Sequence, residues 1–139
     1  MIAILDIQAV YSRGLTDPKS LTSQERLVYL LVDLETCADM EGWDHFFMHS
    51  GIEYYPEILA GLRAAGDMES LEILQDYERA LREHGVAFDS DAIGDFMCNA
   101  SDEYLQSCRD WREDYSRLAE ARWQKVKDYL SQYGYTIMA

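Results

Sequence analysis

The 139-residue chain is 48% hydrophobic, which is enough for one buried core and too little length for two ordinary domains, so residues 1–139 are expected to form a single compact domain. It has 12 basic and 26 acidic residues and a formal net charge of −14. This charge argues against direct binding to nucleic acid or to an anionic membrane surface, because both are themselves negatively charged.

The first forty residues are predicted to hold two helices. Apolar residues over 4–11 favour a short N-terminal helix. Thr22 and Glu25 have the spacing of a capping box, in which each side chain satisfies a backbone N–H of the first helical turn. The helix that begins there is expected to continue to Met40, because its apolar residues recur every three or four positions.

The next segment combines aromatic residues with glycine and proline. Trp43, Phe46 and Phe47 predict a short helix that ends at Gly51. Pro56 suits the first position of the following helix, where its missing N–H costs nothing. Two helices separated by a short break are therefore expected here.

The rest of the chain also shows helical periodicity. Helices are predicted over 71–84 and 90–97, and Ser101 is expected to cap a long C-terminal helical segment over 101–134. No segment alternates apolar and polar residues over more than a few positions. The expected fold is therefore all-α, with about six or seven helices.

The acidic residues are concentrated in the middle of the chain. Residues 1–20, an N-terminal helix and loop, have no net charge, whereas the helical core over 21–100 carries −13 and residues 101–139 carry only −1. Such a concentration favours a surface that binds a basic partner; the alternative is that the charge only confers solubility. The candidate partner-binding residues are Asp67, Glu69, Glu72, Asp76, Glu78, Glu83, Asp89, Asp91 and Asp95.

Glu41, His45 and His49 follow one another at intervals of four, which on a continuous helix would bring carboxylate and imidazole groups together. The pattern is not a zinc-binding motif, and Gly42 interrupts it. We therefore expect structural histidines and neither a metal nor another cofactor. A metal-dependent enzyme that uses these residues is the less favoured alternative.

The cysteines do not indicate an active site either. Cys98 or Cys108 together with a histidine would supply the nucleophile and the base of a thiol enzyme. Sequence spacing does not reveal such a pair. The chain has no C-x-x-C pair, so reduced and partly buried cysteines are expected. The apolar N-terminal run lacks the basic start and the length of a signal peptide, which places the protein in the cytoplasm. The expected protein is not an enzyme.

The segment over 25–62 resembles the small acidic bacterial proteins that include a DNA mimic protein. That family's pattern runs Asn-Gly-Gly-Phe-x-Gln-Phe-Phe-x-Asn-Ser and then glycine, where this chain reads "MEGWDHFFMHSG". The matching positions, interpreted as a structural motif, are Gly42, Trp43, Phe46, Phe47, Ser50 and Gly51. The chain departs from the pattern at Met40, Glu41, His45 and His49.

This resemblance implies a mostly helical fold and an acidic surface whose carboxylates imitate DNA phosphates. The function expected from charge and resemblance is therefore a protein-interaction module that occupies the DNA-binding face of a basic protein. An immunity or antitoxin protein that inhibits a basic nuclease toxin is the alternative. The partner's identity and the oligomeric state do not follow from the sequence.

Overall fold

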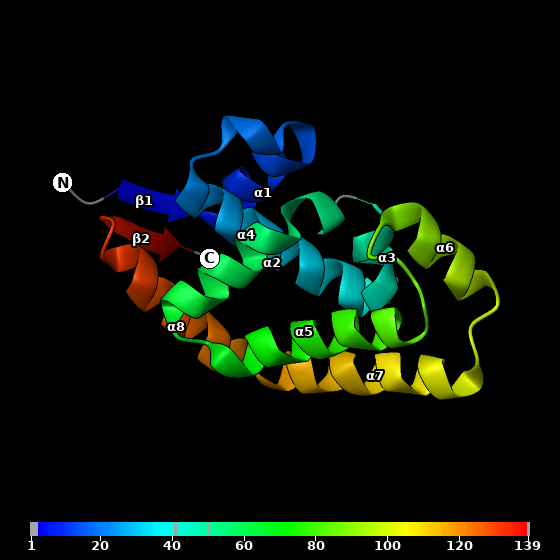
Figure 1. Ribbon diagram of the computed structural model, residues 1–139. Helices are drawn as coiled ribbons and strands as arrows, with labels where there is room; N and C mark the ends of the chain where they lie inside the picture. The colour runs from blue at the N-terminus through cyan, green and yellow to red at the C-terminus, as the bar shows by residue number, and fades with distance from the viewer. Residues whose placement is uncertain (1–2, 41, 50, 139) are drawn as a thin grey trace.

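The computed structural model describes residues 3–40, 42–49 and 51–138, and these form a single all-α domain with a small two-stranded sheet (Figure 1). The elements in chain order are β1 (Ala3–Asp6), α1 (Ile7–Thr16), the 3-10 helix η1 (Pro18–Ser20), α2 (Ser23–Met40), α3 (Trp43–Met48), α4 (Gly51–Ala65), α5 (Met68–Glu83), α6 (Ser90–Cys98), α7 (Asp102–Arg117), α8 (Ala119–Ser131) and β2 (Tyr135–Met138).

The two ends of the described chain meet in a parallel pair of strands. Ala3 pairs with Tyr135 and Asp6 pairs with Met138. The helix expected over 4–11 is therefore wrong in its first part, and α1 begins at Ile7, where Asp6 caps it by accepting bonds from two backbone N–H groups. The strand exists because of its distant partner, so local periodicity did not reveal it.

Helix α2 forms the centre of the domain, in contact with α1, α3 and α4. Its predicted capping box is confirmed, because Thr22 N donates to Glu25 Oε1 and Glu25 N donates to Thr22 Oγ1. The helix ends at Met40 as expected. Its apolar stripe supplies the fully buried residues Val28, Leu30, Leu31 and Leu34.

The prediction that Gly51 ends one helix and Pro56 starts the next is wrong. Helix α4 begins at Gly51, so Pro56 lies inside its second turn. Only glycine fits at position 51 without a shift of its neighbours, because a Cβ on Gly51 would lie 2.4 Å from ring atoms of Phe46. The absence of a Cβ at Gly51 therefore allows the first residue of α4 to pack closely against α3.

The long C-terminal segment is divided into α7 and α8 at Leu118. Helix α7 lies beside α5, whereas α8 turns away toward α4 and the sheet (Figure 1). The Arg122 guanidinium donates to the carbonyl oxygen of Tyr115, a group near the C-terminal end of α7, and so stabilises the break. Gly134 adopts a φ of 81° and lets the chain turn from α8 into β2.

None of the described helices is long and apolar enough to cross a membrane.

Candidate functional site

One of the nine acidic candidates is buried. Asp67 is only 2% exposed, and its carboxylate caps α5 by accepting a bond from Ser70 N. Its assignment to a partner-binding surface is therefore wrong. Asp67 is a helix N-cap, and the net charge of a segment does not distinguish a capping aspartate from an exposed one.

The other candidates fall into groups along and beyond α5. Glu69, Glu72 and Asp76 lie on its first half, and Glu78 and Glu83 lie on its second half. The remaining candidates are exposed residues of α6: Asp89 is its N-cap, Asp91 lies in its first turn and Asp95 lies in its second half. Helix α6 packs on α3 beyond the far end of α5 (Figure 1), so the candidates do not share one face. Asp89 also caps α6 through Ala92 N.

Part of this charge is neutralised by ion pairs along α5. Asp76 pairs with Arg79 at 2.7 Å, and Glu78 pairs with Arg82 at 2.8 Å. Exposed pairs of this kind contribute little to stability, but they do reduce the local field. Glu69 and Glu72 are exposed and form no ion pair with any described residue.

An acidic groove runs between α5 and α7. Its carboxylates are Glu69, Glu72, Asp76 and Asp114, and its floor contains Ile73 and Leu118. Asp114 comes from α7 and pairs with Arg117, which also lines the groove. Charge counting missed Asp114 because its segment is nearly neutral overall; its position on the exposed side of an amphipathic helix was the available signal. Carboxylates from two helices thus line one concave surface.

The Gly-aromatic motif lies in the core. Trp43, Phe46 and Phe47 are at most 2% exposed, and Phe47 stacks at 4.7 Å between ring centroids on Tyr77 of α5. Gly42 adopts a φ of 105° just before α3, a conformation that favours glycine. Ser50 lies outside the described residues. The motif residues that are described hold α3 against the rest of the domain.

Asp44 is a buried carboxylate that the sequence analysis missed. It is 6% exposed and accepts hydrogen bonds from the hydroxyl groups of Tyr77 and Tyr104 and, at 3.3 Å, from Cys108 Sγ. The three donors come from α5 and α7, so one side chain of α3 joins three helices. A charged residue inside an aromatic motif was the available signal.

Burial and the nearby Asp44 carboxylate raise the pKa values of Tyr77, Tyr104 and the Cys108 thiol well above their ordinary values. Burial likewise raises the pKa of Tyr29 to about 12. The ionised forms are disfavoured because they would place a negative charge in a nonpolar environment or beside a carboxylate. Cys108 is therefore a poor nucleophile at neutral pH.

These pKa shifts predict a loss of stability in alkali. An unfolded tyrosine releases its proton near its ordinary pKa of 10.0, while folded Tyr77 and Tyr104 retain theirs. Stability is therefore complete below about pH 10 and falls above it, by about 1.4 kcal/mol per pH unit for each such tyrosine. Tyrosinate absorbance should rise together with the loss of helical circular dichroism. Ionisation of the buried tyrosines before any loss of helix would contradict this expectation.

A second buried polar cluster joins α2 to α8. Arg122 is fully buried and donates to Glu35 Oε1 through Nη2 at 2.6 Å and through Nε at 3.2 Å. Trp123 Nε1 donates to the same carboxylate at 2.9 Å, and the guanidinium lies 3.6 Å from the ring centre of Tyr115. The Arg122 guanidinium is thus held by Glu35, by Ser70 and by the carbonyl oxygen of Tyr115, which supports a structural role for it.

Comparison with known proteins identifies the family. A family model described as "DMP19-like protein" matches residues 19–133. The chain belongs to the DMP19-like family. Searches of curated proteins and of solved structures found no match. The DMP19-like region includes both the acidic groove and the Asp44 cluster, and it excludes β1, α1 and β2.

His45 and His49 of this DMP19-like domain lie together, and His84 lies apart from them. The rings of His45 and His49 are 4.2 Å apart, and Asp33 lies close enough for both to influence its carboxylate. Burial raises the pKa of Asp33, while the hydrogen bond from Tyr11 and the two histidines act in the opposite direction. Over residues 3–40, 42–49 and 51–138, no cluster of three or more ligand-type side chains would hold a metal ion. Glu41 lies outside these ranges.

The three cysteines of the DMP19-like domain occupy different environments. Cys37 is half-buried, Cys98 is exposed and Cys108 is buried, and none of the three forms a disulfide in the described structure. The expectation of partial burial is wrong for Cys98. Cys108 contacts Asp44, while His84 packs against Phe96 and Tyr104.

Proposed function

We propose that this protein is an acidic interaction module that occupies the DNA-binding face of a basic protein, and that binding is its whole activity. The observation that carries the proposal is the acidic groove between α5 and α7. Membership of the DMP19-like family, a family of DNA mimic proteins, supports it. So does the net charge of −14.

The groove suits a cationic partner for two physical reasons. Residues three or four positions apart on a helix have Cβ atoms about 5–6 Å apart, so Glu69, Glu72 and Asp76 form a row of carboxylates at a spacing on the order of that along a DNA strand. In this row Asp76 also pairs with Arg79. Glu69 and Glu72 form no ion pair with a described basic residue, so they remain available to a basic partner. Lysine and arginine side chains that normally contact phosphates would meet carboxylates here.

The first test is capture of partners from a lysate of the native host at low salt, followed by elution with a salt step. We expect one DNA-binding protein, released by high salt and displaced by duplex DNA. Recovery of a nuclease would identify the alternative inhibitor function. Binding that is the same at low and high salt would contradict the proposal.

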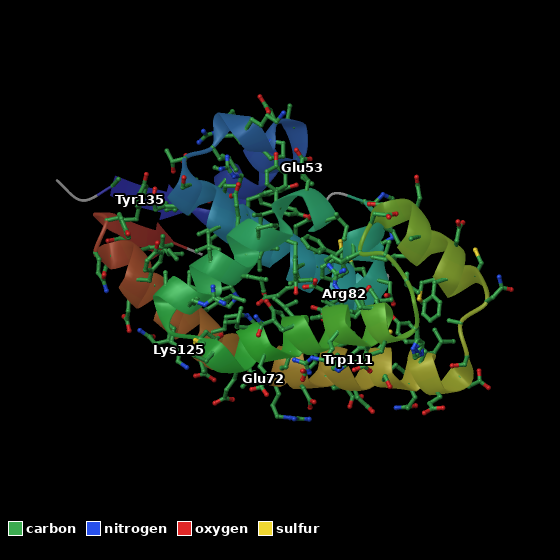
Figure 2. The ribbon with its side chains drawn as sticks, viewed as in Figure 1. Glu53, Glu72, Arg82, Trp111, Lys125 and Tyr135 are labelled. Carbon is green, nitrogen blue, oxygen red and sulfur yellow. The ribbon has the colours of Figure 1, made fainter. Side chains whose placement is uncertain are left out.

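Charge-removing variants then locate the contact. We expect E69Q/E72Q to weaken partner binding by about tenfold or more, because both carboxylates lie in the groove. The matched control D39N/E53Q removes the same charge from exposed positions on α2 and α4. Figure 2 shows Glu53 and Glu72 on opposite sides of the domain. Equal weakening by both variants would show that total charge, and not the groove, determines binding.

A further inference from the structure

A pocket of about 370 Å³ opens where α3, α6 and α7 meet, a volume within the range of sites for small molecules. It is separate from the acidic groove, which lies between α5 and α7. Its walls combine apolar side chains with charges of both signs. The residues that define it are Asp44, Met48, Met97, Leu105, Arg109 and Arg112.

The two arginines of the pocket form no ion pair with a described carboxylate. Six of the chain's nine arginines form such a pair, whereas Arg63, Arg109 and Arg112 do not, and of these three only Arg109 and Arg112 share a pocket. In a protein with more than twice as many acids as bases, two adjacent arginines without an ion pair in the described structure indicate a site for an anionic group from outside. Arg109 is held by Gln106 of its own helix, and no described side chain holds Arg112.

The opposite charge in the pocket belongs to Asp44. Its Oδ1 receives both tyrosine hydroxyl groups, whereas Oδ2 receives only the thiol of Cys108, a weak donor, at 3.3 Å. Oδ2 therefore retains acceptor capacity on the side where Cys108 and Asp44 line the pocket. A cationic donor bound there would balance a buried carboxylate that has no ion pair with any described base.

The spacing between the two charges limits the ligand. Cys108 contacts Asp44, and Arg112 follows Cys108 by four residues on α7, so its side chain begins one helical turn away. Asp44 and Arg112 line the same pocket and form no ion pair with each other in the described structure, so one small molecule in the pocket can contact both. Met48, Met97 and Leu105 supply an apolar wall beside that bridge.

We propose that this pocket binds a free α-amino acid with an apolar side chain. Its ammonium group contacts Asp44 Oδ2, its carboxylate contacts the guanidinium of Arg112 with support from Arg109, and its side chain packs on the methionine and leucine wall. The carboxylate of a free amino acid satisfies the arginine, and the ammonium group satisfies the aspartate, so neither charge remains unpaired. This inference does not depend on the proposed partner of the acidic groove.

The test measures binding of L-leucine, L-methionine and L-phenylalanine to the whole chain by calorimetry, up to about 10 mM. We expect saturable binding of at least one of them. For L-leucine, its analogue without the carboxylate, isoamylamine, and its analogue without the amine, 4-methylpentanoate, separate the two contacts. Each analogue of the bound amino acid is expected to bind at least about tenfold more weakly.

Matched variants assign the contact to this pocket. We expect R112Q to weaken binding about tenfold, because it removes the charged donor for the carboxylate. R63Q is the control, since Arg63 is exposed on α4 and also has no described ion pair, and it should bind as the parent chain does. Absence of binding by all three amino acids, equal affinity for an analogue, or unchanged affinity in a folded R112Q variant would each overturn the proposal.

Discussion

Replacing Arg122 with alanine is expected to lower the free energy of unfolding by about 3–5 kcal/mol and the Tm by about 10–20 °C. The guanidinium is fully buried and holds Glu35, Ser70 and the carbonyl oxygen of Tyr115 together. Its removal leaves a half-buried carboxylate without its cation and a cavity against the Tyr115 ring. Denaturant unfolding followed by circular dichroism measures the loss.

The control for this prediction is Arg79, which also forms an ion pair but is exposed. R79A removes its pair with Asp76 and is expected to change the free energy of unfolding by no more than about 0.5 kcal/mol. If R122A and R79A lowered the free energy of unfolding by similar amounts, burial of the Glu35–Arg122 pair would not increase the effect of losing the arginine. The double variant E35L/R122M should be more stable than R122A, because it removes both charges and leaves neither unpaired.

The sequence predicted this protein's helices better than their ends. The apolar period of α2 and its capping box depend on neighbouring residues, so both were visible locally. The strand β1 forms only because β2 lies beside it, more than a hundred residues later in the chain. Gly51 at the start of α4 likewise packs against the Phe46 ring of α3, a contact between two helices. These features come from tertiary packing, which a local pattern does not contain.

The candidate surface was predicted in part, because charge counting finds carboxylates but not their environment. Glu69 and Glu72 are exposed as expected, whereas Asp67 is a buried N-cap. Asp114 also lines the groove, although it comes from a segment that is nearly neutral overall. Arg122 is buried although it is charged. It lies four residues after Leu118 and four before Val126, so a charged residue continues the apolar stripe of α8. A charge in an apolar stripe is therefore a useful sequence signal for a buried ion pair.

The largest effect at the α3 end of the core is expected from Asp44. D44A leaves the hydroxyl groups of Tyr77 and Tyr104 and the Cys108 thiol without their common acceptor. A buried polar group without a partner costs about 1–3 kcal/mol, so we expect D44A to destabilise the fold by about 3–5 kcal/mol. D44N keeps one carbonyl oxygen for the tyrosines and should cost only about 1 kcal/mol. D95A, at an exposed position on α6, should leave stability unchanged.

A double-mutant cycle separates unpaired donors from simple loss of volume at Asp44. Y77F removes one of the donors, so its cost should be smaller in the D44A background than in the parent chain, with a coupling energy of about 1–3 kcal/mol. The reason is that a hydroxyl group without an acceptor stabilises nothing and its removal relieves a desolvation cost. Strictly additive effects of D44A and Y77F in denaturant unfolding would mean that the cavity alone explains the loss. Coupling of the expected size would show that the Asp44 carboxylate joins α3 to α5 through the Tyr77 hydroxyl group.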